Sequence, residues 1–488
     1  MTSSIEVAVI ILAAGFGTRM HSEKPKVLHK LAGRSMLSHL VHTTTSIPNK
    51  RVIVVVGYKR TSLISEINRL SAKLKLKIDI AIQDDQFGTG HALACGINVL
   101  PLNFNGLVLS FSSDIPMLDD KTLNSLIRNH NISRASTSFI TTTIIEPKGY
   151  GRIHRKCNGK IIKIIEDSDA KKTQLQIKEV NAGVYIFNFI DLCFALKQLV
   201  PNNLQYEFYL TDVVSILSSY GLTIQAVNIK DSNLVTGVNN RFQLSKLNAE
   251  FNHRIVIHHQ LAGVTIVDPK TTWIDIDVEI GRDTIINPNT QLFGKCKIGT
   301  KCKLGPDSTL IDVEVGSNVS VVRTHGNLAI IGSDSTIGPF THLRPGTILG
   351  NKVKIGSFVE TKDSTIGDGT KISHITYVGD TDIGRYSNIG ASSVFVNYDG
   401  KNKYKTKVGS CVRTGANTMF VAPIKVGDGA YTGAGAILRE DVPPNALAVS
   451  HNTQRNIKNW VQYKRPKSNK VLIVKNKTYR KESNEQNS

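Results

Sequence analysis

The sequence predicts two fold classes in succession: an α/β domain with a mostly parallel sheet, then an all-β domain that is a parallel β-helix. Three observations predict this. Continuous aliphatic runs alternate with helical stretches up to about residue 240. From about residue 263, an aliphatic residue followed by glycine recurs on a six-residue period. The chain of 488 residues is also too long for one compact core, so more than one domain is expected.

The α/β prediction rests on three aliphatic runs, at residues 7–12, 51–57 and 107–111. Strands that are apolar throughout are buried on both faces, which indicates a mostly parallel sheet with helices on each side. Ligands of such sheets bind at the carboxyl ends of the strands. Gly15 and Asp114, which follow the first and third runs, therefore fall where a site is expected.

A single connecting helix is predicted for residues 242–261. Leu244, Leu247, Phe251 and Ile255 recur there at helical spacing, with polar residues between them.

The β-helix prediction rests on ten aliphatic–glycine pairs that share one lattice. Three intervals between pairs are 18 residues and three are 6, which describes triangular coils of three hexads each. Cys296 and Cys302 follow the same period, so we expect them to be wall residues rather than metal ligands. The aliphatic members are Ile280, Ile298, Leu304, Ile331, Ile337, Ile355, Ile383, Ile389, Val408 and Val426.

The charge balance raises the hypothesis of a nucleic-acid binder. Sixty Lys and Arg residues face 39 Asp and Glu residues, a formal net charge of +21. Aromatic residues make up only 6% of the chain and interleave with no basic run, so solvated surface lysine is the favoured interpretation. Residues 464–488 hold eight Lys and Arg against two Glu, a net of +6, and we expect a basic, flexible tail there.

The remaining composition favours a cytoplasmic protein. None of the six cysteines forms a CxxC pair, and a chain of this length needs no disulfides to fold. No apolar run approaches the roughly 20 residues that span a bilayer, and the N-terminus lacks the basic flank of a signal peptide. We therefore expect no membrane insertion.

The first chemical motif is LAAGFGTRM at residues 12–20, followed by KPK at 24–26. Glycines after a strand leave backbone N–H groups free to approach phosphates, and Arg19 and Lys26 add positive charge. The motif is not a Walker loop, because no Gly-Lys-Ser/Thr follows it. It is not the dinucleotide fingerprint either, because Met20 stands where a third Gly or Ala would be required. With KPKVLHKLAG, it resembles the signature of nucleotide-diphosphate-sugar pyrophosphorylases.

Together with the repeat half, residues from about 5 to 460 resemble the bacterial bifunctional enzymes that combine UDP-N-acetylglucosamine pyrophosphorylase with glucosamine-1-phosphate N-acetyltransferase. The resemblance implies a Rossmann-like nucleotidyltransferase domain at 1–241, a linker helix at 242–262, a left-handed parallel β-helix at 263–460 and a tail at 461–488. It also implies a homotrimer, small-molecule substrates and a role in cell-wall and lipopolysaccharide precursor synthesis.

For the N-terminal half, the resemblance implies uridylyl transfer from UTP to N-acetylglucosamine-1-phosphate, with pyrophosphate leaving. Asp114 and Asn239 would bind Mg²⁺, and a carboxylate with an amide oxygen suits that ion. Arg19 and Lys26 would neutralise charge, since a phosphate nucleophile needs no general base. The implied nucleotide and sugar contacts are Leu12, Ala13, Ala14, Gly15, Lys26, Gln83, Gly88, Thr89, Ser112, Gly151, Glu166, Asn181 and Asn239.

For the C-terminal half, the resemblance implies acetyl transfer from acetyl-CoA to glucosamine-1-phosphate. His374 would be the general base that takes a proton from the sugar amine. Residues 397–400 lie in a loop that stretches one repeat interval to 19, and such an excursion can carry a site. The implied sugar-phosphate contacts are Arg344, Lys362, Tyr377, Asn388 and Lys403, and the implied acetyl-CoA contacts are Ala391, Asn397, Tyr398, Ala416, Ala434 and His451.

Four residues depart from the family pattern. Phe16 replaces a polar residue, Ser113 a glycine that precedes the metal ligand, Ala416 a serine, and His451 an arginine that would meet CoA phosphates.

Two alternatives remain open from the sequence. In one, only nucleotidyl transfer is active and the β-helix is structural or regulatory. In the other, the basic charge marks a nucleic-acid binder.

Overall fold

The computed structural model describes residues 5–57, 60–450 and 454–464. The chain divides into two compact units, Met1–Lys352 and Val353–Ser488, and each is described by itself. Predicted residue His451 and nearly all of the basic tail lie outside the described residues.

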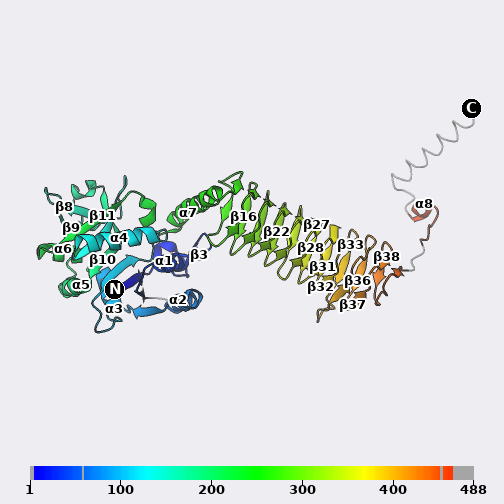
Figure 1. Cartoon of the computed structure of the whole chain (residues 1–488), viewed down its shortest axis with the longest axis horizontal. Coiled ribbons are helices and arrows are strands. Elements are labelled where there is room, and N and C mark those ends of the chain that lie inside the picture. The colour runs from blue at the N-terminus through cyan, green and yellow to red at the C-terminus, as the bar shows by residue number, and fades with distance from the viewer. Residues whose placement is uncertain (1–4, 58–59, 451–453, 465–488) are drawn as a thin grey trace, which may run out of the picture. The chain divides into compact units, whose positions relative to one another are not determined.

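The first unit begins with an α/β fold around a nine-stranded sheet, whose main order is β11-β7-β10-β6-β1-β4-β5 (Figure 1). β1 pairs in parallel with β4 and β6, whereas β10 runs antiparallel to β6 and β7. The strands are β1 (Val7–Ala13), β4 (Lys50–Val56), β5 (Ile78–Ile82), β6 (Leu107–Ser112), β7 (Thr137–Thr143), β8 (Arg152–Arg155), β9 (Ile161–Ile165), β10 (Glu179–Asn188) and β11 (Ile224–Ile229).

Alternate residues of β1 explain why the strand is apolar throughout. Val9 and Ile11 enter one buried core, and Ala8 and Ile10 enter the core on the opposite face. Successive strand side chains point to opposite faces, so a sheet covered on both sides needs aliphatic residues at every position. The covering helices are α1 (Met36–Thr44), α2 (Arg60–Leu74), α3 (Thr89–Ile97), α4 (Asp120–Ser133), α5 (Phe189–Leu196) and α6 (Leu210–Ser219).

The predicted connecting helix is α7 (Arg241–Leu261). It begins where Asn240 accepts a hydrogen bond from the backbone N–H of Gln243, which satisfies one of the free donors of the first turn. Asn248 on α7 accepts from the Ala32 backbone N–H at 2.9 Å, at the turn between β2 (Lys30–Leu31) and β3 (Arg34–Ser35).

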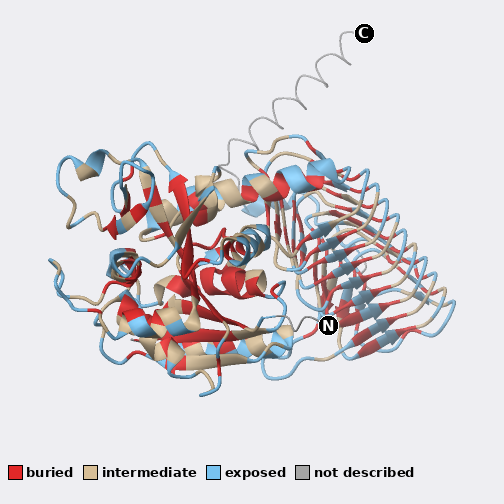
Figure 2. Cartoon of the chain, turned by 60° about the vertical axis from the view of Figure 1, so that its left-hand side comes forward, coloured by how far each residue is buried: buried red, intermediate tan, exposed pale blue. Residues whose placement is uncertain are grey.

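The first unit continues with parallel β-helix coils, as the hexad period predicts. Ile266, Ile286, Leu304, Val321 and Ile337 stack inside one wall and are almost fully buried. Figure 2 shows the resulting alternation of buried and exposed residues along the coils. The three walls are β12 (Thr265–Ile266), β15 (Ile285–Ile286), β18 (Lys303–Leu304), β21 (Ser320–Val321) and β24 (Thr336–Ile337); β13 (Trp273–Ile274), β16 (Thr290–Phe293), β19 (Ser308–Ile311), β22 (Thr324–Asn327) and β25 (Thr341–Leu343); and β14 (Glu279–Ile280), β17 (Lys297–Ile298), β20 (Glu314–Val315), β23 (Ile330–Ile331) and β26 (Ile348–Leu349).

The glycine of each repeat is required by the next coil rather than by its own backbone angles. A Cβ on Gly299 would lie 2.6 Å from the carbonyl carbon of Gly316, and one on Gly332 would lie 2.4 Å from that of Gly350. These distances are below any van der Waals contact, so the column of glycines sets the close stacking of the coils. Cys296 and Cys302 are buried wall residues, in agreement with the sequence prediction.

The second unit repeats the three-walled pattern. Its walls are β27 (Lys354–Ser357), β30 (Lys371–His374) and β33 (Asn388–Ile389); β28 (Glu360–Lys362), β31 (Tyr377–Gly379), β34 (Val394–Val396), β36 (Met419–Val421) and β39 (Ile437–Leu438); and β29 (Thr365–Ile366), β32 (Thr381–Ile383), β35 (Thr406–Val408) and β37 (Ile424–Val426). β38 (Tyr431–Thr432) pairs with β40 (Leu447–Ala448), and α8 (Trp460–Lys464) follows. None of the helices in the described ranges is long and apolar enough to cross a membrane.

Candidate functional sites

The carboxyl ends of β1 and β6 hold a charged cluster built around Lys26. The Lys26 Nζ donates to Asp114 Oδ2 at 2.7 Å and to Asn239 Oδ1 at 3.3 Å. Arg19 donates to the same Asn239 oxygen at 3.3 Å. Four residues that the sequence singled out, separated by up to 220 positions, therefore meet at one point.

Asp114 is held in its ionised form. Burial alone would raise its pKa, but the Lys26 ammonium and hydrogen bonds from Lys26 and Ser112 keep the pKa below its ordinary value. The Ser112 Oγ donates to Asp114 Oδ1 at 2.7 Å. Ser113, one of the departures, is buried, and its backbone N–H donates to the Leu12 carbonyl at 3.0 Å. This bond joins the Asp114 loop to the glycine-rich loop.

The oxygens around Lys26 fit a hard divalent cation. The Asp114 carboxylate and the Asn239 amide oxygen already face a shared positive charge, and these are ligand types that Mg²⁺ accepts beside phosphate oxygens and water. No cage of three or more His, Cys, Asp or Glu side chains occurs among the residues that the structure describes. An ion at Asp114 and Asn239 would thus complete its shell from a phosphorylated substrate.

The glycine-rich loop is packed against the loop that follows β5. The Ala14 carbonyl accepts a hydrogen bond from Gln86 Nε2, and a Cβ on Gly57 would lie 2.6 Å from the same carbonyl oxygen. Around Gly15, by contrast, nothing lies within 4 Å of a Cβ position. Leu12 and Ala13 end β1. The loop is therefore packed against protein at Ala14, whereas the space beside Gly15 is open.

The side chain of Gln83 is buried and lies beside Gly88 and Thr89. Its Nε2 donates to the Gly88 carbonyl at 3.1 Å. The Thr89 Oγ1 accepts from the Leu210 backbone N–H at 3.0 Å, which joins α3 to α6. The structure thus brings the second predicted nucleotide segment together as one rigid turn.

Gly151, Glu166 and Asn181 also converge. The Asn181 backbone N–H donates to the Gly151 carbonyl at 2.8 Å, and a Cβ on Gly151 would lie 3.6 Å from both the Asn181 Cβ and a Glu166 carboxylate oxygen. Thr211 donates to Glu166 at 2.9 Å. Burial raises the pKa of Glu166, the Thr211 hydrogen bond opposes this, and nearby aspartates raise it further. The three residues thus form one polar cluster.

Sequence reasoning missed three contributors to these sites. They are Gln86, Thr211 and Tyr150, whose hydroxyl lies against Thr236 and the Gly237 backbone, just before Asn239. Gln86 lies three residues after Gln83 and Tyr150 directly precedes Gly151, so proximity to predicted residues is a signal that could have found them. No local sequence signal marks Thr211.

In the second unit, Lys362, Tyr377, Asn397 and Lys403 gather around Asp380. The Lys362 Nζ lies 2.6 Å from Asp363 and 3.5 Å from Asp380. Asn397 donates to Asp380 and, at 3.4 Å, to the Tyr377 hydroxyl. The Asp363 hydrogen bond, together with Asp380 and Lys403, raises the pKa of Lys362. Asp380, which sequence reasoning missed, lies six residues after His374 in the sequence.

The loop after β34 is a short hairpin. Tyr398 and Lys403 pair as an antiparallel bridge, and the Tyr398 hydroxyl donates to the Gly400 carbonyl at 2.6 Å. The Asn397 carbonyl accepts from the Tyr404 N–H at 2.8 Å. These bonds hold the side chains of Asn397 and Lys403 near Lys362.

His374 ends β30 and is exposed. Its backbone carbonyl accepts from Thr376 Oγ1 at 2.7 Å and from the Ser392 N–H at 3.3 Å. Its ring makes no hydrogen bond to the described part of the chain, which leaves both nitrogens accessible. Asn388 begins β33, and its side chain likewise makes no hydrogen bond to described residues.

Ala391, Ala416 and Ala434 lie on successive coils. The Asn417 N–H donates to the Ala391 carbonyl at 2.7 Å, and the Gly435 N–H donates to the Ala416 carbonyl at 2.8 Å. Arg344 directly follows β25, in the first unit.

Comparison with known proteins covers both halves. The family described as Nucleotidyl transferase matches residues 8–276, and the family Bacterial transferase hexapeptide (six repeats) matches residues 329–362. The Bifunctional protein GlmU of Mycolicibacterium smegmatis is 57% identical over 468 residues, which cover 96% of this chain and 97% of that protein. The chain belongs to the bifunctional GlmU family.

Other relatives agree with this assignment. The GlmU proteins of Mycobacterium tuberculosis and Mycobacterium bovis are each 57% identical over 96% of this chain and 94% of their own length. Because the similarity spans both halves, the chain is an enzyme with a nucleotidyltransferase half and a hexapeptide acyltransferase half. Membership in the GlmU family favours the bifunctional interpretation over the monofunctional alternative.

Proposed function

We propose that this GlmU-family chain makes UDP-N-acetylglucosamine in two steps. The β-helix half transfers an acetyl group from acetyl-CoA to glucosamine-1-phosphate. The α/β half then transfers a uridylyl group from UTP to the N-acetylglucosamine-1-phosphate that results. The observation that carries the proposal is the convergence of Lys26, Arg19, Asp114 and Asn239.

In uridylyl transfer, a phosphate oxygen of the sugar phosphate attacks the α-phosphorus of UTP and pyrophosphate leaves. Such a transfer depends on alignment and charge neutralisation. Mg²⁺, held by Asp114 and Asn239, would supply charge neutralisation for the phosphate oxygens. Lys26 and Arg19 carry the remaining positive charge. Gly151, Glu166 and Asn181 would orient the amino sugar.

The nucleotide would be bound by two segments. Leu12, Ala13, Ala14 and Gly15 would form one side, with open space beside Gly15, and Gln83, Gly88, Thr89 and Ser112 would form the other side. A hydrogen-bonded Gln83 in a fixed turn suits recognition of a uracil edge.

In acetyl transfer, His374 would take a proton from the sugar amine as the amine attacks the thioester carbonyl. An exposed imidazole with no hydrogen bond to described residues suits that role. Lys362, Lys403, Arg344, Tyr377 and Asn388 would hold the sugar phosphate. Asn397 would polarise the thioester carbonyl, and Ala391, Tyr398, Ala416, Ala434 and His451 would line the acetyl-CoA path.

The proposal includes domain limits and assembly. Residues 1–241 would carry uridylyl transfer, 263–460 acetyl transfer, and 242–262 would link them. We further propose a cytoplasmic homotrimer that supplies cell-wall and lipopolysaccharide precursors, as the hexapeptide repeat supports an oligomer.

A coupled assay tests the function. Purified protein with glucosamine-1-phosphate, acetyl-CoA, UTP and Mg²⁺ should yield UDP-N-acetylglucosamine, free CoA and pyrophosphate. Absence of CoA release with glucosamine-1-phosphate would refute the acetyltransferase assignment. Absence of pyrophosphate release with N-acetylglucosamine-1-phosphate and UTP would refute the uridylyltransferase assignment.

A further inference from the structure

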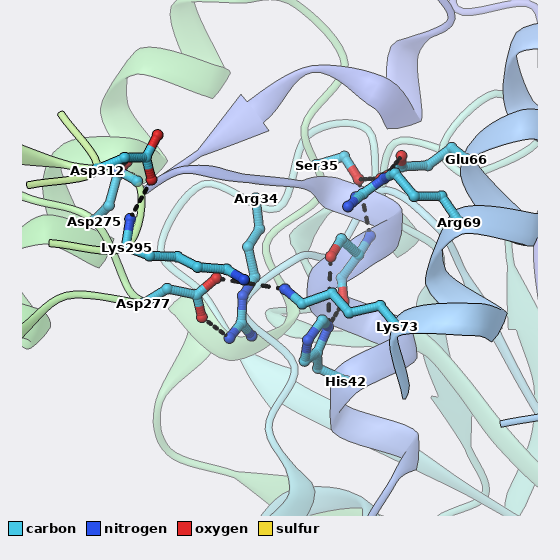
Figure 3. A network of polar contacts seen from close by, with 12 residues as sticks. Arg34, Ser35, His42, Glu66, Arg69, Lys73, Asp275, Asp277, Lys295 and Asp312 are labelled. Atoms are coloured by element: carbon cyan, nitrogen blue, oxygen red, sulfur yellow. Dashed lines mark hydrogen bonds and ion pairs between the residues drawn. The ribbon is translucent and has the colours of Figure 1, made fainter. Parts of the chain in front are cut away.

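A cavity of about 630 Å³ lies where the β2–β3 hairpin, helix α2 and the first β-helix coils meet (Figure 3). We call it the hairpin cavity. Its walls come from three segments that are far apart in the sequence, residues 24–38, 62–73 and 275–312. None of the residues assigned above to either reaction lines it.

The walls of the hairpin cavity are held in place by backbone contacts. The Ile276 N–H donates to the Ala32 carbonyl at 3.1 Å, so the hairpin tip is bonded to the first coil. Gly33 has φ +85°, and a Cβ there would lie 2.6 Å from the Asp275 carboxylate. The tip therefore fits against Asp275 only with glycine at this turn. The cavity is a built feature of the first unit.

Every carboxylate that lines the cavity already accepts a hydrogen bond or ion pair from another group of the chain. Asp277 pairs with Arg34 and lies 3.7 Å from the Lys73 Nζ, as Figure 3 shows. Glu66 accepts two hydrogen bonds from Arg69, at 2.7 and 2.9 Å, and one from Ser35 at 2.9 Å.

The two other carboxylates cap backbone amides. Asp275 accepts from the Gly294 N–H at 2.7 Å, and Asp312 accepts from the Lys295 N–H at 2.9 Å.

Three lysine side chains that line the cavity have no carboxylate partner. Lys24, Lys30 and Lys295 have no carboxylate within 4 Å of the Nζ atom anywhere in the described ranges. A fourth group, the buried Nε of Arg34, has no hydrogen-bond partner there either. Six cationic side chains thus face four carboxylates, and the surplus consists of unpaired donors on the hairpin side and the coil side.

We propose that the hairpin cavity binds a small phosphate-bearing anion. The surplus of two positive charges is matched by a ligand with two negative charges, and a phosphate ester carries close to two near neutral pH. A monocarboxylate would leave half of this surplus uncompensated. The volume admits an organic substituent in addition to the phosphate.

The test uses inorganic tripolyphosphate as the probe and the full-length protein. Calorimetric titration compares wild type with a Lys30→Ala/Lys295→Ala variant. The matched control is Lys297→Ala/Lys303→Ala, which removes the same charge from exposed positions on the coils. The cavity variant should bind one tripolyphosphate fewer per chain, or bind it at least about tenfold more weakly, while the control matches wild type.

The exposed lysines carry no core packing, and unchanged uridylyl kinetics in both variants would show intact folding. Equal titration curves for wild type and the cavity variant would overturn the proposal. An equal loss in the control variant would overturn it too, because the effect would then be one of overall charge.

Discussion

Arg152 is a buried charge that supports the polar cluster of Gly151, Glu166 and Asn181. Its side chain is only 2% exposed and pairs with Asp167 at 2.9 Å, and a second nitrogen donates to the Tyr150 carbonyl. These bonds tie β8 to the segment after β9, on either side of Gly151 and Glu166. We expect Arg152→Met, which keeps an apolar side chain, to weaken the contact between β8 and the segment after β9.

The magnitude follows from the burial of the two partners. Breaking a fully buried pair costs about 3–5 kcal/mol. Asp167 is 30% exposed and can regain water, so we expect a smaller cost for Arg152→Met, about 2–3 kcal/mol. The same strand offers a matched control. Arg155 pairs with Glu179 but is 35% exposed, and a surface pair of this kind is worth about 0–1 kcal/mol.

Calorimetric unfolding and uridylyl kinetics of Arg152→Met and Arg155→Met test this reasoning. Arg152→Met should lower the unfolding temperature further and raise the KM for N-acetylglucosamine-1-phosphate more than the KM for UTP. Acetyl transfer in the same chain serves as an internal control and should be unchanged. If Arg152→Met destabilises no more than Arg155→Met, the role assigned to the buried guanidinium is wrong.

Four further outcomes are expected. Burial raises the pKa of Glu166 above 4.5, so ionisation of this carboxylate lowers the folding stability as the pH rises through that range. Glu166→Gln should therefore raise the melting temperature at about pH 8 but not below about pH 4. An equal gain at both pH values would contradict the burial argument. Lys26→Met should lower uridylyl kcat by about 10²-fold, with acetyl transfer intact; a change in KM alone would refute a role in charge neutralisation. His374→Ala should lower acetyl transfer by about 10²–10⁴-fold without affecting UTP-dependent activity, and near-normal acetyl transfer would exclude it as the base. Deletion of residues 464–488 should not change salt-dependent retention on DNA, whereas loss of strong retention would support the nucleic-acid alternative.

Periodicity predicted the fold because it records burial directly. The uniform apolar character of β1 follows from cores on both of its faces, and the hexads follow from one inward aliphatic residue per wall. The position of α7 followed in the same way from helical spacing. The hand of the β-helix is different: it came from the resemblance and not from the pattern of residues.

The candidate sites were predictable only in part. Asp114 and Lys26 lie after strands or within a glycine-rich motif, so sheet topology places them at one edge. Thr211 and Arg152 take their importance from burial and from partners 45 and 15 residues away. Such partnerships depend on how strands β8 to β10 pack against α6, and no local pattern of residues encodes that packing. The same holds for the hairpin cavity, whose unpaired lysines are ordinary surface residues in the sequence.

The column of glycines in the β-helix sets the spacing between adjacent coils. Parallel strands in adjacent coils lie about 4.8 Å apart, and a Cβ on Gly415 would already lie 2.5 Å from the Ala434 backbone nitrogen, so the coils cannot move closer together. Ala391, Ala416 and Ala434 on successive coils therefore lie at a fixed spacing, about 10 Å from first to last. An extended ligand arm along this column would therefore meet the three alanines at a spacing that the coils cannot shorten.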